Sequence, residues 1–114
     1  MKKILIFSHE FPPDIGGAGV VAEQNARALS KNGYSVTVLT KEQKVIKQSK
    51  EYRIIPVKSF GKLWFIMYRN SVDFDSFDLI FLNDPASVYV AGLFFNKKLL
   101  LKSIVFLQGT EPET

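Results

Sequence analysis

Five short, almost continuously apolar runs constrain the fold of this chain more than any other feature of its sequence. They are Lys3 to Phe7, Val36 to Leu39, Arg53 to Val57, Leu79 to Leu82 and Ile104 to Leu107. Such runs do not alternate between apolar and polar residues, which is typical of strands buried on both faces of a parallel sheet. The pattern therefore predicts an α/β protein with about five parallel strands.

Longer stretches between several of these runs carry the signals of helices. Ala18 to Lys31 has apolar residues at helical spacing and ends at Asn32-Gly33, a typical helix stop. A second helix is predicted from near Phe60 to before Asp73. A third is predicted from Ala86 to about Asn96, because in Asp84-Pro85 the aspartate is a good cap and the proline fits the first helical position.

Alternating strands and helices imply right-handed crossovers and a Rossmann-like three-layer α/β/α sandwich. We expect the strand order 3-2-1-4-5, which reverses between the first and fourth strands. Ligands bind at such a reversal, beyond the carboxyl ends of the strands. The segments expected there are His9 to Gly19, Asn83-Asp84 and Gln108 to Glu111.

The size and composition fit one domain, which we expect to span residues 1–114. With 46% hydrophobic and 23% charged residues, the chain is not expected to be disordered. It has no Cys and no apolar run near the roughly 18 residues that cross a bilayer, so a cytoplasmic location is expected. A net charge of +4 without a dense basic and aromatic patch does not predict nucleic-acid binding.

Gly16 and Gly17 precede the first predicted helix. Glycines there let backbone N–H groups approach an anion, and the helix N-terminus attracts negative charge, so a phosphate is one expected guest. An ordinary strand-to-helix turn is the alternative. Gly17 to Ala22 also fits the G-x-G-x-x-A dinucleotide fingerprint, but Ser8 to Ile15 make the loop longer than the tight turn of that site.

The remaining candidates are polar residues at predicted strand ends. Gln108 and Glu111 are suited to hydrogen-bonding a hydroxyl and are candidates for a catalytic role, or they belong to a plain turn. Asn83 and Asp84 are interpreted first as a helix cap and second as ligand contacts. His9 is the single histidine and fits either a catalytic role or a hydrogen-bonded loop position. One histidine with scattered carboxylates predicts no metal site.

The order and spacing of these motifs resemble the N-terminal domain of family-4 type retaining glycosyltransferases. The resemblance covers nearly the whole chain through four segments: Lys3 to Gly17 with Phe11-Pro12-Pro13, Ala28 to Val38, Phe77 to Ile80, and Val105 to Glu111. It implies half of a two-domain GT-B architecture that uses a nucleotide-sugar as substrate, with no further cofactor. The implied acceptor is a glycan or lipid-linked sugar, as in cell-envelope polysaccharide synthesis.

By the same resemblance, Gly16 and Gly17 face the donor diphosphate, while Asn83, Asp84, Gln108 and Glu111 lie on the acceptor side. The family commonly has His where this chain has Gln108, and glutamine cannot take a proton near neutral pH. The donor-binding C-terminal domain is not among these residues. We therefore expect a fragment or split half, inactive alone, that works with a donor domain in cis or in trans.

Three alternatives stay open. The chain is also consistent with a non-catalytic Rossmann-like binding or assembly module, or with a small dinucleotide-binding domain that uses Glu42 for the ribose. Phe60 to Arg69 is apolar nearly all round, which predicts a buried helix. The other interpretation is an interfacial helix with Trp64 and Tyr68 at headgroup depth, in peripheral contact with the inner face of a membrane.

Overall fold

The computed structural model describes residues 2–12, 17–43 and 48–106. These residues form a five-stranded sheet with the order β3-β2-β1-β4-β5, and every neighbouring pair is parallel. The strands are β1 (Lys3–Phe7), β2 (Ser35–Lys41), β3 (Arg53–Val57), β4 (Leu79–Leu82) and β5 (Ser103–Val105). The predicted strand order and Rossmann-like α/β class are confirmed.

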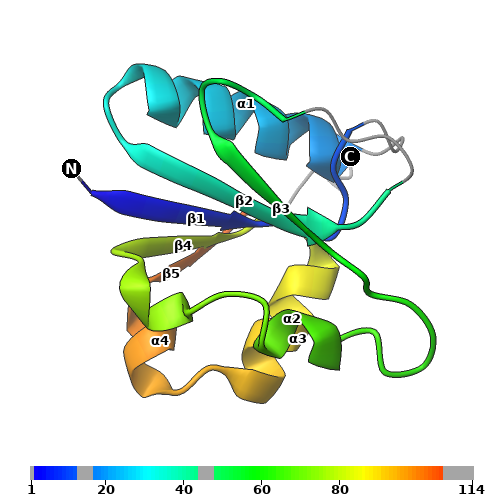
Figure 1. The fold of residues 1–114 in the computed structure, drawn as a ribbon. Helices are drawn as coiled ribbons and strands as arrows, with labels where there is room; N and C mark the ends of the chain where they lie inside the picture. The colour runs from blue at the N-terminus through cyan, green and yellow to red at the C-terminus, as the bar shows by residue number, and fades with distance from the viewer. Residues whose placement is uncertain (1, 13–16, 44–47, 107–114) are drawn as a thin grey trace, which may run out of the picture.

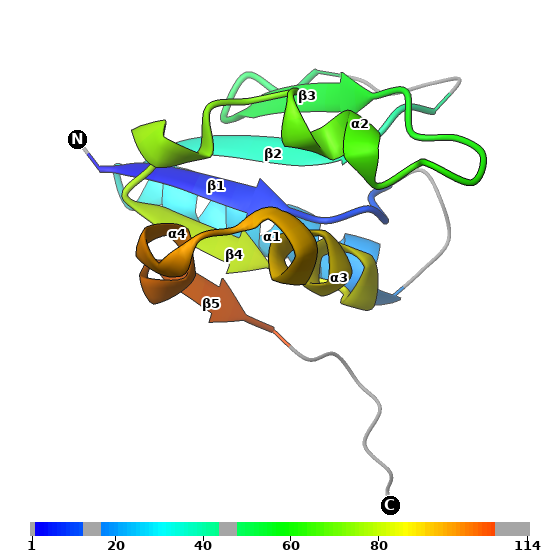
Figure 2. The ribbon, with the colours of Figure 1, turned by 90° about the horizontal axis from the view of Figure 1, so that it is seen from below.

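Helices cover both faces of this sheet and complete three layers. They are α1 (Gly17–Lys31), α2 (Ile66–Arg69), α3 (Pro85–Phe94), α4 (Lys97–Leu101) and the short 3₁₀ helix η1 (Phe74–Ser76). Of the helices in the described residues, α1 alone lies on one face, and α2, α3 and α4 lie on the other (Figures 1 and 2). None of the described helices is long and apolar enough to cross a membrane.

Alternate residues of the strands feed two separate hydrophobic clusters. On the α1 face, Ile4, Ile6 and Val38 pack against Ala22 and Ala26 of the helix. Small residues along one side of α1 let the helix lie close to the sheet. On the opposite face, Leu5, Phe7, Leu39, Ile80 and Leu82 pack against residues of α2, α3 and α4. The central strands are therefore buried on both faces, as predicted.

Two glycines fix the ends of α1. A Cβ added to Gly19 would lie 3.0 Å from both the backbone N and Cα of Phe11, so the first helical turn touches the segment after β1. Gly33 has φ +91° and follows the helix at the position where a left-handed residue is needed. Its N–H donates to the Ser30 carbonyl, and the Tyr34 N–H donates to the Leu29 carbonyl. These two bonds form a Schellman motif and confirm the predicted stop.

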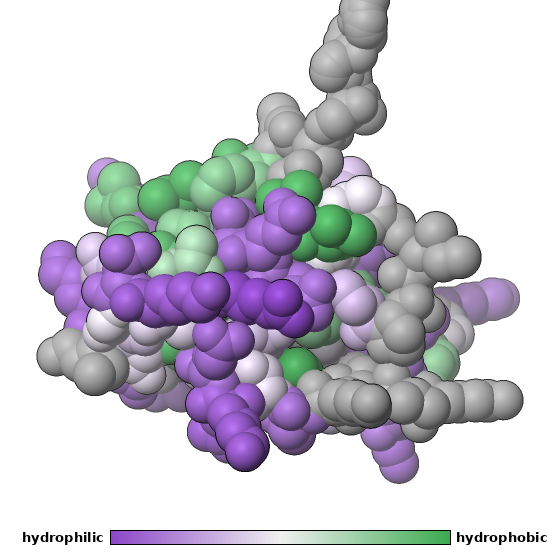
Figure 3. All heavy atoms as spheres, turned by 90° about the horizontal axis from the view of Figure 1, so that it is seen from above, coloured by the Kyte–Doolittle hydropathy of each residue, from purple (hydrophilic) through white to green (hydrophobic). Residues whose placement is uncertain are grey.

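The structure corrects several predicted elements. The second predicted helix is much shorter, because Gly61 adopts φ +77° and only Ile66–Arg69 is α-helical. The last strand is Ser103–Val105 rather than Ile104 to Leu107, and Leu107 lies outside the described residues. This edge strand is not buried on both faces, because Ile104 and Val105 are exposed. Apolar side chains gather along that edge in Figure 3.

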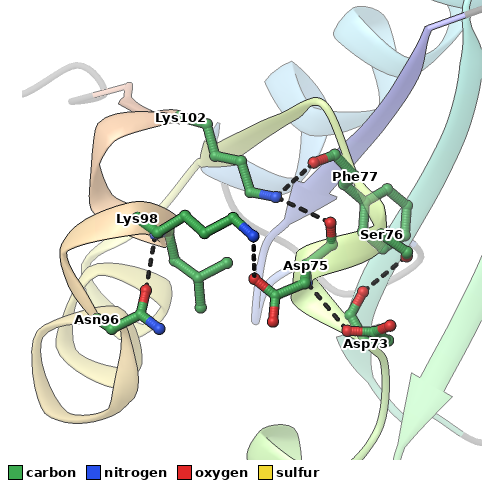
Figure 4. A network of polar contacts seen from close by, with 8 residues as sticks. Asp73, Asp75, Ser76, Phe77, Asn96, Lys98 and Lys102 are labelled. Carbon is green, nitrogen blue, oxygen red and sulfur yellow. Dashed lines mark hydrogen bonds and ion pairs between the residues drawn. The ribbon is translucent and has the colours of Figure 1, made fainter.

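Helices α4 and η1 were not predicted, and a polar network joins them (Figure 4). Asn96 caps α4 by accepting from the Leu99 N–H at 2.9 Å. The Lys102 ammonium donates to the carbonyl of Phe77 at 2.6 Å and to that of Asp75 at 3.1 Å. The Lys98–Asp75 ion pair, at 3.9 Å, is exposed and contributes little. Lys102 thus anchors the α4 end to the turn that leads into β4.

Candidate functional site

The strand order reverses between β1 and β4, whose carboxyl ends lie side by side. The Asn83 N–H donates to the Phe7 carbonyl at 3.0 Å, so the pairing of the two strands continues to their ends. The N-terminus of α1 returns to this place from β1. The structure therefore brings together His9, Gly17, Asn83 and Asp84, as predicted for a ligand site at a reversal of strand order.

Asp84 uses both carboxylate oxygens on backbone N–H groups. Oδ1 accepts from the Ser87 N–H at 3.0 Å, which together with the Ser87 hydroxyl completes a capping box for α3. Oδ2 accepts from the Glu10 N–H at 2.9 Å. The residue is only 3% exposed. Its predicted cap role is confirmed, and it also holds the segment after β1 in place.

Asn83 connects β4 to the first turn of α1. Its side-chain amide donates to the Ala18 carbonyl at 2.6 Å and to the Ser8 hydroxyl at 3.4 Å. The side chain is fully buried, and its Oδ1 has no hydrogen-bond partner within the described part of the chain. A buried amide oxygen normally accepts a hydrogen bond. Asn83 therefore has acceptor capacity left over at the head of α1.

The N-terminus of α1 is suited to an anion. Its first turn carries no acidic residue, and the unpaired N–H groups of a helix start attract negative charge. Gly17 is exposed, and no described atom would lie within 4 Å of a Cβ placed on it. The backbone is thus open to a close approach at Gly17, while Gly16 lies outside the described residues.

His9 follows β1 and is held by aromatic residues from the segment around α2. Its Nδ1 lies 2.6 Å from the Tyr68 hydroxyl, and its ring centroid lies 5.0 Å from that of Trp64. This distance is that of a hydrogen bond, and the tautomer of the imidazole decides which of the two groups donates. The hydrogen-bonded interpretation of His9 is confirmed, and a catalytic role stays a prediction.

Tyr68 was not identified from the sequence as a neighbour of His9. The interpretation that places it at headgroup depth is wrong, because its side chain extends from α2 and is fully buried against β1, with its ring centroid 4.8 Å from that of Phe7. Burial raises the pKa of its hydroxyl far above the ordinary value, so Tyr68 keeps its proton. The 59 residues between Tyr68 and His9 carry no spacing signal that links them.

Other predictions about the site have different outcomes. Gln108 and Glu111 lie outside the described residues, so their acceptor-side roles stay predictions. Among residues 2–12, 17–43 and 48–106, no three His, Asp or Glu side chains gather to hold a metal ion. Residues 8–16 separate β1 from α1, a loop unlike the tight dinucleotide-binding turn.

A cavity of about 880 Å³ lies at the other end of the sheet. Lys3, Ser35 and Arg53, which begin β1, β2 and β3, line it together with Asp73 and Phe77. Its charged groups have mixed sign. Because ligands of such folds bind beyond the carboxyl ends of the strands, this cavity is not the candidate site.

Comparisons with known proteins identify the family of the chain and support its fold. Residues 3–105 match the family described as the starch synthase catalytic domain. No curated protein matches the chain significantly. Among solved structures, it is similar to sucrose-phosphate synthase (tll1590) from Thermosynechococcus elongatus, with a TM-score of 0.64 and 21% sequence identity. The similarity covers 82% of this chain and 30% of that enzyme's chain.

The family match extends from the first residue of β1 to the last residue of β5, so it includes the whole described sheet. The solved neighbour is a GT-B enzyme, and its structural similarity to this chain supports the Rossmann-like α/β fold. Because the chain spans less than a third of that neighbour, it corresponds to part of such an enzyme. The chain belongs to the starch synthase catalytic-domain family of glycosyltransferases, as a partial domain.

Proposed function

We propose that this chain is the acceptor-side part of a retaining glycosyltransferase of the family-4 type. Together with a donor-binding domain, in cis or in trans, it transfers a sugar from a nucleotide-sugar to a glycan or lipid-linked acceptor. The nucleotide-sugar is a substrate, and no further cofactor is proposed. The proposal includes a cytoplasmic location, consistent with the absence of Cys.

The family match over residues 3–105 is the observation that carries the glycosyltransferase part of this proposal. The geometry of the reversal of strand order supports it. The start of α1, with Gly17 open to close approach, offers partial positive charge to a diphosphate. His9, which follows β1 and is partly exposed, lies at the same place.

The chain alone is proposed to be catalytically incomplete, for an electrostatic reason. Departure of a nucleoside diphosphate needs preorganised positive charge around the leaving group. The described crevice supplies a helix N-terminus and one imidazole. The carboxylate of Asp84 there already accepts hydrogen bonds from backbone N–H groups. The donor domain is therefore proposed to bring the remaining cationic groups.

The test is reconstitution. The chain is assayed alone and together with a GT-B donor domain encoded next to it or downstream of it, using UDP-, GDP- and ADP-linked sugars with glycan and lipid-linked acceptors. We expect release of the nucleoside diphosphate only from the combination. Turnover by the chain alone would show that it is catalytically complete, and an inactive combination over the whole panel would favour a non-catalytic module.

A charge variant tests the proposed diphosphate position in the active combination. Gly17→Asp places a carboxylate at the head of α1, where repulsion of a phosphate a few ångströms away exceeds about 1 kcal/mol. We expect the KM for the nucleotide-sugar to rise at least about fivefold. Gln24→Asp, further along the same helix on an exposed position, is the matched control and leaves KM unchanged.

A further inference from the structure

Five large apolar side chains are exposed on α3 and on the segment 60–67, which runs into α2. They are 49% to 59% exposed and are, in chain order, Phe60, Leu63, Met67, Tyr89 and Leu93. We call them the α2–α3 patch. Large exposed apolar patches, especially ones rimmed by polar residues, mark interaction sites.

Ring contacts hold the two halves of the α2–α3 patch together. The Trp64 ring stacks on Tyr89 with centroids 6.0 Å apart, and the Phe65 ring lies edge-on to Tyr89 at 5.8 Å. Tyr68, which follows the exposed Met67, is buried and contacts His9. The segment therefore has an inner side that contacts the candidate crevice and an outer side that is apolar and exposed.

Cations surround this patch, and acidic residues are absent from its segments. Lys58, Lys62 and Arg69 are exposed. The Lys41 ammonium lies 5.4 Å from the centre of the Phe60 ring, and the Arg69 guanidinium 5.3 Å from that of Phe94. The sequence has no Asp or Glu between residues 58 and 72 or between residues 85 and 106. The patch thus combines apolar side chains with charge of one sign.

The apolar surface at β5 differs in this respect. It includes Leu100, Leu101, Ile104 and Val105, all of which are exposed, and it lies at the sheet edge seen in Figure 3. Of the three lysines beside it, Lys102 donates to two backbone carbonyls, Lys98 lies 3.9 Å from Asp75, and Lys97 is exposed. The β5 surface therefore has charges of both signs beside it, whereas the segments of the α2–α3 patch carry only the positive charge that attracts anionic lipid.

We propose that the α2–α3 patch docks on the surface of an anionic lipid bilayer. Its apolar side chains enter the boundary between headgroups and acyl chains, and Lys58, Lys62 and Arg69 bind lipid phosphates. The described helices are too short to span a bilayer, so the contact is interfacial. Docking in this way places the crevice at His9 next to the lipid surface, where a lipid-linked acceptor would be presented.

The chain contains one tryptophan, which makes Trp64 a local reporter. The full chain is titrated with phosphatidylcholine vesicles, with and without phosphatidylglycerol, while Trp64 emission and co-sedimentation are recorded. We expect binding and a blue-shifted emission only with phosphatidylglycerol. Binding should weaken at high salt, because screening shortens the range of the attraction. Lack of binding to anionic vesicles at low salt would overturn the proposal.

Matched variants distinguish binding through the α2–α3 patch from non-specific adsorption. Leu63→Glu should abolish vesicle binding, and Lys62→Gln should weaken it about fivefold, the share of one cation near an anionic surface. Leu101→Glu makes the same change at an exposed leucine of the β5 surface, and Lys31→Gln does so at an exposed lysine of α1. Both controls should bind like the parent chain.

Two results would count against lipid as the occupant. Equal loss of binding in Leu63→Glu and Leu101→Glu would mean that the chain adsorbs without a defined face. A dimer of the parent chain by light scattering that Leu63→Glu converts to monomer, without any vesicle binding, would assign the patch to a second copy. Vesicle binding does not require sugar transfer, so its failure leaves the proposed enzyme function standing.

Discussion

Replacing Asp84 with alanine should destabilise the protein more than any other single change at the crevice. The carboxylate is 3% exposed and accepts from the backbone N–H groups of Ser87 and Glu10 at 3.0 and 2.9 Å. Losing the helix cap costs about 1 kcal/mol, and losing a hydrogen bond to a charged group costs about 2 kcal/mol. We therefore expect the free energy of unfolding to fall by about 3 kcal/mol and Tm to fall by more than about 10 °C.

Two further variants divide this loss. Asp84→Asn keeps one acceptor oxygen but turns an amide N–H toward the second backbone donor, so it should cost about 1.5 to 2 kcal/mol. Ser87→Ala removes only the other half of the capping box, where the Ser87 hydroxyl contacts the Asp84 N–H at 3.2 Å and its carbonyl at 2.8 Å. That change should cost about 1 kcal/mol.

Urea unfolding followed by circular dichroism measures these differences, with an unchanged slope expected for all three variants. Hydrogen exchange of the Glu10 amide supplies a local measurement. Its protection should fall in Asp84→Ala beyond the loss of global stability, and it should follow global stability in Ser87→Ala. Equal protection of Glu10 in both, or a smaller cost for Asp84→Ala than for Ser87→Ala, would refute the double role of Asp84.

Three other predictions concern glycine packing and the buried tyrosine. Gly19→Ala should lower stability by about 1 to 2 kcal/mol because its Cβ would lie 3.0 Å from the Phe11 backbone. Gly92→Ala, where no described atom is within 4 Å of a Cβ, should raise stability by up to about 1 kcal/mol in the same urea assay. Because burial raises the pKa of Tyr68 above its ordinary value of 10.0, the unfolded chain loses this proton first. Stability should therefore fall above about pH 10 by up to about 1.4 kcal/mol per pH unit, and Tyr68→Phe should reduce that slope in urea titrations at several pH values.

Most of the sheet was predictable because the relevant signals are local. A central parallel strand is buried on both faces, so β1 and β4 are recognised as apolar runs without reference to their neighbours. The cap at Asp84-Pro85 and the stop at Gly33 depend on dihedral angles and hydrogen bonds within a few residues. These same local features fix where the chain turns back at the crevice.

Elements fixed by distant contacts were predicted poorly. The apolar segment from Phe60 onward was interpreted as one helix, yet Gly61 adopts a positive φ and only Ile66–Arg69 is α-helical. The Ser59 hydroxyl donates to the Trp64 carbonyl at 2.7 Å, and this compact turn brings Trp64 and Tyr68 against His9. Helix α4 was missed because Lys97–Leu101 is too short to show a helical period.

The position of the site was predictable from the sequence, but the contacts that each of its residues makes were not. The reversal of strand order identifies His9, Asn83 and Asp84 as neighbours. Which of them a ligand is able to reach depends on contacts such as Asp84 to Glu10, which are 74 residues apart in the chain. No spacing rule relates such pairs, because the loops between them have no fixed length.

The exposed fraction of each of these residues decides whether a ligand is able to contact its side chain. Asn83 and Asp84 are 0% and 3% exposed and bind backbone groups at the heads of α1 and α3. A sugar or phosphate in the crevice therefore meets the start of α1 and the partly exposed His9 before it meets either of them. Substitution at Asn83 or Asp84 should weaken ligand binding and lower stability together, because both side chains hold the backbone segments that form the crevice. Substitution at His9 should weaken binding with a smaller loss of stability, of about 1 to 2 kcal/mol, because the buried Tyr68 hydroxyl loses this partner while the partly exposed ring gives up little buried area.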